Sequence, residues 1–346
     1  MADNILIVGP AWVGDMVLAQ SLFKFLKQRH PRSRLDVLAP AWTLPLLARM
    51  PEVDAAIAAP FVHGKFDFSA RLRLGRELRA RHYDRALVLP NSLKSAIMPF
   101  AARIPRRTGF VGELRYVLLN DARKLDKKTL PRTVDRFIAL GLDVGEMLPA
   151  EIPHPQLRAD AAGARATLAR LGHERPKAPV LGLCPGAEYG PAKRWPAEYF
   201  AEVANARLAD GWEVWLFGSD KDAAVTRAVQ AGTQDRCLDL AGKTTLTEAI
   251  DLLALTTAVV TNDSGLMHIA AALDRRLVAV YGSSDPRHTP PLGARATVLY
   301  LDLPCSPCFK RECPLGHLKC LKDLHPAVVL EVLDSTRDEE RGTRGE

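Results

Sequence analysis

The sequence predicts an α/β protein built from two doubly wound domains, each with a parallel sheet. Short apolar runs alternate with helical patterns in both halves of the chain, as expected for strand-helix-strand units with parallel strands. A proline-rich stretch from about residue 141 to 179 interrupts this alternation. With 346 residues, of which 47% are hydrophobic, the chain is long enough to form two cores.

The boundary between the domains is expected within that proline-rich stretch. The predicted N-terminal domain covers residues 1–160, and the predicted C-terminal domain covers residues 161–335. The tail at residues 336–346 is charged and has no apolar periodicity, so we expect it to be frayed.

The net charge of +7 favours an anionic partner, such as nucleic acid, a phosphorylated substrate or an acidic membrane surface. The sequence contains no groove-reading or aromatic RNA-binding motif, so we expect no nucleic acid partner. The N-terminus lacks the pattern of a signal peptide, and no apolar run is long enough to span a bilayer. We therefore expect a cytoplasmic location, where the six cysteines would be reduced thiols or metal ligands.

The first strand is expected at residues 4–8, and a turn leads from it to a helical pattern over 16–28. Asp15 lies at the start of this helix, where the helix dipole stabilises a carboxylate and lowers its pKa. This residue is either a functional carboxylate that stays ionised at neutral pH or an ordinary helix cap. Two further strands are expected at residues 35–38 and 86–89.

A second strand-to-helix turn follows at residues 90–95, and a group of basic residues lies just beyond it. These bases could face an anionic substrate, or they could form a solvated surface. The pattern leaves both interpretations open for Arg103, Arg106, Arg107 and Arg115.

In the second half, strands are expected at residues 180–183, 213–217, 258–260 and 277–281. The first of them runs into a glycine-containing loop that carries Lys193 just before a helix, where a lysine can neutralise a phosphate. The loop lacks the spacing of a P-loop, and neither half contains G-x-G-x-x-G. Binding of a nucleoside triphosphate or a dinucleotide therefore loses support.

The strand at 258–260 leads into a polar turn and an alanine-rich helix. Asp263 and Ser264 are expected at the N-terminus of this helix, at the carboxyl edge of the sheet, where open α/β sheets bind ligands. Free backbone N–H groups and the helix dipole would suit a diphosphate, and Asp263 and His268 could bond hydroxyls or phosphate oxygens. The alternative is an ordinary helix cap.

Two further patterns are candidates for metal binding. Asp220 and Asp222 form a D-x-D, which could hold a metal on a nucleotide sugar or could be a simple loop. Four cysteines follow the spacing C-x2-C-x4-C-x6-C, which does not match the usual paired zinc knuckles. A structural metal, reduced thiols in a surface hairpin and a redox-sensitive pair remain open for Cys305, Cys308, Cys313 and Cys320.

Five segments together closely resemble the ADP-heptose:lipopolysaccharide heptosyltransferase II family, within glycosyltransferase family 9. They are GPAWVGD at 9–15, LPNS at 89–92, PGAE at 185–188, PAKRWP at 191–196 and TNDSGLMH at 261–268. The resemblance extends over almost the whole chain. It implies the GT-B architecture, in which two doubly wound α/β domains face each other, with the acceptor on the first and the donor on the second.

The resemblance also implies a reaction. Heptose would move from ADP-heptose onto the first heptose of the lipopolysaccharide inner core, with inversion at the anomeric carbon. Asp15 would be the general base, and Lys193 would contact the diphosphate of the departing ADP. The expected donor-binding residues are Glu188, Lys193, Asp220, Thr244, Asp263, Ser264, Gly265 and His268, and those expected on the acceptor side are Trp12, Asn91, Lys94 and Arg107.

By the same resemblance the chemistry needs no cofactor or metal, and ADP-heptose is a co-substrate. The expected partners are ADP-heptose, heptosyl-Kdo2-lipid A and the inner-leaflet membrane surface, which the protein would bind peripherally. One alternative is a heptosyltransferase for another core position, and a second is a nucleotide-sugar epimerase of the same architecture. A third is a non-catalytic module that binds a nucleotide or depends on zinc.

Overall fold

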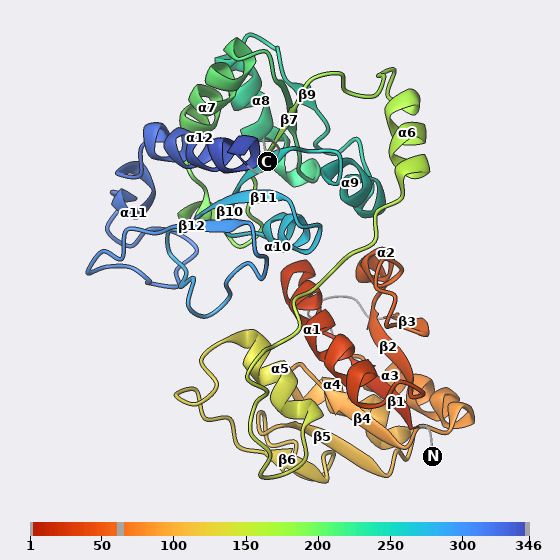
Figure 1. Ribbon diagram of the computed structural model, residues 1–346. Helices are drawn as coiled ribbons and strands as arrows, with labels where there is room; N and C mark the ends of the chain where they lie inside the picture. The colour runs from red at the N-terminus through yellow and green to blue at the C-terminus, as the bar shows by residue number, and fades with distance from the viewer. Residues whose placement is uncertain (1–2, 61–65, 343–346) are drawn as a thin grey trace. The chain divides into compact units, whose positions relative to one another are not determined.

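The computed structural model describes residues 3–60 and 66–342 of the chain. The chain divides into two compact units, Met1–Arg158 and Ala159–Glu346, and each is described by itself. Both are α/β units in which helices surround a parallel sheet (Figure 1), and each sheet has six strands. Within the described residues, no helix is long and apolar enough to cross a bilayer.

The sheet of the first unit has the order β3-β2-β1-β4-β5-β6. From β1 the chain adds β2 and β3 on one side and then β4, β5 and β6 on the other. The parallel neighbours β1 and β4 therefore form the topological switch point of the sheet. The apolar runs predicted at residues 4–8, 35–38 and 86–89 lie in β1, β2 and β4. The strands are β1 (Asn4–Val8), β2 (Arg34–Pro40), β3 (Ala55–Ala59), β4 (Arg85–Val88), β5 (Arg106–Phe110) and β6 (Asp121–Arg123).

Helices of the first unit pack in pairs: α1 contacts α5, and α3 contacts α4. One hydrophobic cluster joins the central strands to α4, as expected for parallel strands covered by helices. It contains Leu6, Val8 and Val88 of the strands and Ala96 and Met98 of α4. The helices are α1 (Val13–Arg29), α2 (Leu44–Leu47), α3 (Phe68–Glu77), α4 (Leu93–Ala101) and α5 (Thr133–Gly141), with 3-10 turns at Ala41–Thr43 and Leu78–Arg81.

The second unit repeats this topology with the strand order β12-β11-β10-β7-β8-β9. Here β7 and β10 are the parallel neighbours at the switch point. The strands predicted in the second half all coincide with strands of this sheet. The strands are β7 (Val180–Cys184), β8 (Glu213–Leu216), β9 (Leu238–Asp239), β10 (Ala258–Asn262), β11 (Arg276–Val280) and β12 (Ala296–Leu299).

The core of the second unit joins the sheet to α7 and α12. Trp195 and Phe200 are fully buried beside Val214 and Val260, and their rings meet edge to face at 5.0 Å. The helices are α6 (Ala161–Arg170), α7 (Ala197–Ala209), α8 (Ala223–Gly232), α9 (Leu246–Leu253), α10 (Gly265–Ala272), α11 (Lys319–Lys322) and α12 (Pro326–Gly342), with 3-10 turns at Pro191–Lys193 and Asp220–Asp222.

The C-terminal helix reaches into the charged tail. α12 continues to Gly342, and the fraying expected for residues 336–346 stays a prediction. Glutamate and arginine have good helix propensity even without an apolar stripe, and a periodicity argument overlooks this. Residues 343–346 lie outside the described residues.

Candidate active site

The switch point of the second unit brings two predicted loops together. β7 leads into the loop at 185–196, and its neighbour β10 leads into Asp263 and the start of α10. Asn262 links the two loops, because its side chain accepts a hydrogen bond from the backbone N–H of Trp195 (2.9 Å) and donates one to the carbonyl of Pro185 (2.6 Å). This amide is completely buried, so it fixes the relative position of the loops.

Lys193 and Asp263 form the charged centre of this edge. The ammonium Nζ of Lys193 lies 2.5 Å from Oδ2 of Asp263, and the hydroxyl of Ser284 donates a hydrogen bond to the same carboxylate oxygen. Asp263 and Ser284 are buried, and 17% of the Lys193 side chain is exposed. The buried carboxylate therefore holds a partly accessible cation at the carboxyl edge of the sheet.

The N-terminus of α10 lies beside this pair. Ser264 occupies the N-cap position in an extended conformation, and its side chain makes no capping hydrogen bond. The carboxylate of Asp263 bonds to Lys193 and Ser284, so the alternative of an ordinary Asx-type cap does not describe this turn. The first N–H groups of a helix have no partner within it, and here they favour an anion.

His268 lies one turn further along α10 and is buried. Burial is the main cause that lowers the pKa of its imidazole to about 4; the charge of Lys193 also lowers the pKa, and Asp263 opposes this change. The imidazole is therefore neutral at pH 7. Its Nδ1 atom has no hydrogen-bond partner, so the ring keeps an unused polar atom near the Lys193–Asp263 pair.

The three remaining donor-side candidates lie at neighbouring loops of the second unit. Glu188 forms an exposed ion pair with Lys221 at 2.6 Å. The carboxylate of Asp220 packs against Gly242, where an added Cβ would lie 2.1 Å from Oδ1. Thr244 donates a long hydrogen bond of 3.4 Å to the carbonyl of Leu240.

The D-x-D pattern has a local structural role. Asp222 accepts hydrogen bonds from the backbone N–H and the hydroxyl of Ser219, at 2.9 and 2.8 Å, so it closes a capping box at the 3-10 turn. Across residues 3–60 and 66–342, no three acidic, histidine or cysteine side chains are arranged as ligands of one metal ion. The geometry therefore favours the loop interpretation of this motif.

On the first unit, Asp15 and Asn91 follow the neighbouring strands β1 and β4. Asp15 is in the first turn of α1, whose N-cap is Trp12 rather than Asp15. The helix dipole favours a negative charge at this position. Trp12 is 47% exposed, and Asn91 accepts a hydrogen bond from Arg115 at 3.3 Å. The strand topology thus brings Trp12, Asp15 and Asn91 to one edge of the sheet.

A sequence profile of glycosyltransferase family 9 (heptosyltransferase) matches residues 71–319. Lipopolysaccharide heptosyltransferase 2 of Salmonella typhimurium is 48% identical over 97% of this chain and 99% of its own length. The chain belongs to glycosyltransferase family 9. It is therefore a glycosyltransferase of the heptosyltransferase family, as the sequence motifs predicted.

Further relatives of this heptosyltransferase support the family assignment and the fold. Lipooligosaccharide heptosyltransferase 2 of Haemophilus influenzae is 46% identical over 96% of the chain and 98% of its own length. The structure of E. coli ADP-heptose lps heptosyltransferase II has a TM-score of 0.88 at 45% identity, covering 98% of this chain and 99% of that one. A family 9 glycosyltransferase from Veillonella parvula, 22% identical over 97% of both chains, has the same fold with a TM-score of 0.85. The GT-B prediction is confirmed, and the epimerase alternative is not favoured.

The basic residues that follow β4 in this heptosyltransferase do not form one cluster at the site. Arg107 lies in the amino-terminal half of β5, and its guanidinium donates to the carbonyls of Ile104 and Leu118 at 2.6 and 2.7 Å. The structure therefore does not bring Arg107 to the carboxyl edge where Asp15 lies. Lys94, in the first turn of α4, follows the β4 turn and is half-buried.

Arg115 is buried and structural rather than available to an anionic substrate. Its guanidinium donates hydrogen bonds to the carbonyls of Phe110, Pro90 and Ser92, and burial lowers its pKa to about 10. It fixes the loop that carries Asn91. This role could not be predicted from the sequence, because spacing along the chain does not reveal which arginine turns inward.

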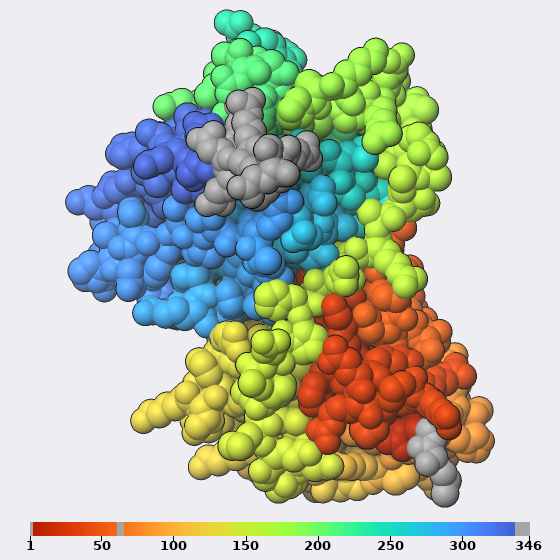
Figure 2. All heavy atoms as spheres, viewed as in Figure 1, coloured from red at the N-terminus to blue at the C-terminus, as the bar shows by residue number. Residues whose placement is uncertain are grey.

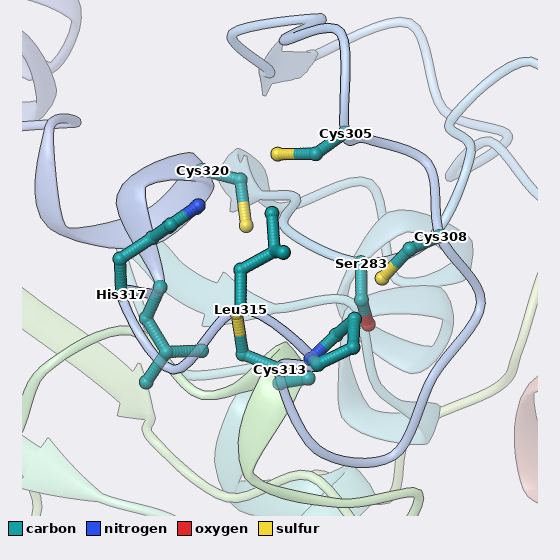
Figure 3. A pocket seen from close by; sticks show the side chains of 10 residues that line it. Ser283, Cys305, Cys308, Cys313, Leu315, His317 and Cys320 are labelled. Atoms are coloured by element: carbon teal, nitrogen blue, oxygen red, sulfur yellow. The ribbon is translucent and has the colours of Figure 1, made fainter.

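The four clustered cysteines of this heptosyltransferase line one small cavity, which Figure 3 shows from close by. All four are free thiols. Backbone N–H groups around Cys313, chiefly that of Leu318, lower the pKa of its thiol. Burial is the main cause that raises the pKa of Cys320 to about 11, with contributions from the three neighbouring thiols.

Proposed function

We propose that this chain transfers L-glycero-D-manno-heptose from ADP-heptose to the first heptose of the lipopolysaccharide inner core, with inversion at the anomeric carbon. The observation that carries the proposal is the Lys193–Asp263–Ser284 arrangement at the start of α10. It suits a diphosphate, and relatives that match almost the full chain are named lipopolysaccharide heptosyltransferase 2.

The donor diphosphate would meet two kinds of positive partner. The N–H groups in the first turn of α10 can donate to its oxygens. Lys193 has three N–H donors, of which Asp263 accepts one, so the others can bind phosphate. As the bond to ADP breaks, negative charge grows on the diphosphate, and a cation already held in place stabilises that charge.

His268 would act as a neutral donor or acceptor. Since its pKa is lowered to about 4, it brings no second positive charge beside Lys193. Its unpartnered Nδ1 atom could bond a phosphate or sugar oxygen. A buried polar atom that gains a bond only when the ligand is present adds affinity and fixes orientation.

Asp15 would be the general base. It accepts the proton of the acceptor hydroxyl while that oxygen forms a bond to the anomeric carbon. The bond between the anomeric carbon and the diphosphate oxygen breaks, and its electron pair leaves with ADP. Because this is a single displacement, the configuration inverts. The atoms and charges balance without a redox partner. Lys193 and the N–H groups of α10 would stabilise the departing diphosphate, so the proposed mechanism uses no cofactor or metal.

A variant of Lys193 tests the donor half of this proposal. Lys193→Met removes the cation, and we expect ADP release in the presence of acceptor to fall about 10²- to 10³-fold, with weaker binding of ADP-heptose. Lys177→Met is the matched control, because Lys177 is an exposed lysine paired with Glu174. Equal ADP release by Lys193→Met and the control would refute the proposed role of Lys193.

A further inference from the structure

The connection from β12 to α11, residues 300–318, contains neither helix nor strand. It lies at the surface of the second unit, within the blue region of Figure 2. Connections of this length without secondary structure are uncommon in compact domains, and ordering each of their residues costs conformational entropy. The glycosyltransferase reaction proposed above gives this segment no role.

Cysteine side chains from four points of this region meet at one cavity. Cys305, Cys308 and Cys313 come from the connection, and Cys320 comes from α11. Figure 3 shows their side chains around the cavity. The cavity has a volume of about 20 Å³, which is room for one water-sized sphere. A substrate does not fit there, but a single ion does.

His317 also lines the cavity, but it is a poor ligand in this arrangement. Its Nδ1 atom accepts a hydrogen bond from the backbone N–H of Lys319 at 3.0 Å. In a neutral imidazole the other nitrogen then carries the proton, so neither nitrogen has a free lone pair. The available donor set is therefore the four sulfurs.

The charges of the region suit a negatively charged metal centre. Four thiolates around a divalent ion carry a net charge of −2. Over residues 300–323, the four basic residues Lys310, Arg311, Lys319 and Lys322 outnumber the three acidic residues Asp302, Glu312 and Asp323. Nearby positive charges lower the free energy of such a centre. Four sulfur donors in a tetrahedron are typical of zinc or iron-sulfur sites, and a structural zinc site is closed by its protein ligands.

We propose that Cys305, Cys308, Cys313 and Cys320 form a tetrathiolate site for one zinc ion that fixes the connection between β12 and α11. The sulfurs are not arranged as ligands in the described structure, so binding requires them to close on the ion. Rotation of a cysteine about χ1 moves its sulfur between staggered positions without moving the backbone. Each thiol releases its proton to solvent as its sulfur binds the metal.

The zinc site would support the donor site through the backbone. Ala192, next to Lys193, donates its N–H to the carbonyl of Arg311 at 3.0 Å. Phe309 donates its N–H to the carbonyl of Ser283 at 2.7 Å, next to Ser284. The metal would thus be structural, because it holds the backbone behind the Lys193–Asp263–Ser284 arrangement without touching the reacting atoms.

The test is the metal content of the purified full-length chain, measured by elemental analysis after exhaustive removal of loosely bound ions. We expect about one zinc per chain, and its loss in Cys308→Ser and Cys313→Ser. Cys237→Ala is the matched control, since Cys237 is buried away from the cluster against Thr233. His317→Gln should keep its zinc. A zinc-free wild type, or zinc retained in both cysteine variants, would overturn the proposal.

A second measurement uses only the wild-type chain, in case the variants do not fold. Replacing the metal by Co²⁺ should give the intense near-ultraviolet thiolate charge-transfer absorption of tetrahedral cobalt. Thiol counting in the native protein should show four cysteines that react only after a chelator removes the metal. Absence of the charge-transfer absorption, or disulfides within the cluster of freshly purified protein, would contradict the tetrathiolate site.

Discussion

At the scale of single residues, His268 of the candidate donor site makes the free energy of unfolding depend on pH. The pKa of its buried imidazole is lowered to about 4 from a usual 6.5, so the unfolded chain binds a proton that the folded chain does not bind between these pH values. The neutral buried imidazole contributes about 3 kcal/mol to the free energy of unfolding. This contribution is fully present above pH 6.5 and is lost as the pH falls towards 4.

Urea unfolding measured from pH 7 to pH 4 checks this prediction. The free energy of unfolding of the wild type should fall more steeply on acidification than that of His268→Gln, which has no imidazole to titrate. Titrating groups that do not interact with His268 contribute equally to both proteins. The difference between the two curves therefore reports His268 together with its coupling to Asp263 and Lys193. Parallel curves would mean that the imidazole is not held neutral by burial.

Several site residues could be predicted from the sequence, and others could not. Lys193 and Asp263 stand in local patterns that place them at strand ends, where parallel sheets bind ligands. Ser284 lies in another loop, after β11, and reaches Asp263 only through the fold. Asn262 joins two loops that are distant in sequence. Local spacing carries no information about such long-range partners.

Whether an arginine side chain points into the core or towards solvent also cannot be predicted from local spacing. For both Arg107 and Arg115, the sequence left open a contact with an anionic substrate and a solvated surface. Arg107 lies in the half of β5 away from the ligand edge, and Arg115 is turned into the core of the first unit. Only the position of Arg107 in its strand and the burial of Arg115 show that neither residue faces the ligand edge.

At the scale of elements, Arg115 ties the β4–α4 turn to the segment after β5. Its guanidinium donates hydrogen bonds to the carbonyls of Phe110, Pro90 and Ser92, and without these bonds the buried site of Arg115 loses its links between the two segments. We expect Arg115→Met to lower the free energy of unfolding of the first unit by about 2–4 kcal/mol. Thermal and urea unfolding measure this loss, with Arg73→Met, an exposed change on α3, as control. Equal stability of the two variants would contradict the structural role of Arg115.

The central strands were predictable and most edge strands were not. β1, β4, β7 and β10 are buried and read as apolar runs, as parallel strands covered on both faces do. The edge strand β9 has two residues, β6 has three, of which two are charged, and β3 is mostly alanine. Short edge strands bury little apolar surface, so they leave no run that a sequence pattern can detect.

At the scale of the whole molecule, the net charge of +7 favours peripheral binding to the anionic cytoplasmic leaflet, where a lipid-linked acceptor would lie. We expect the protein to sediment with anionic vesicles at low salt and to be released near 1 M salt, where the Debye length is about 3 Å. Vesicles of neutral lipid are the control. Failure to bind anionic vesicles at low salt would exclude this electrostatic attraction.

The most direct test of the proposed reaction measures heptose transfer from ADP-heptose to two purified core acceptors, one bearing a single heptose and one bearing none. Wild type and Asp15→Asn are compared on both. We predict product only on the one-heptose acceptor, and a loss of about 10²- to 10⁴-fold in Asp15→Asn while ADP binding persists. Transfer to the bare acceptor would assign another core position, and undiminished transfer by Asp15→Asn would contradict the role of Asp15 as the base.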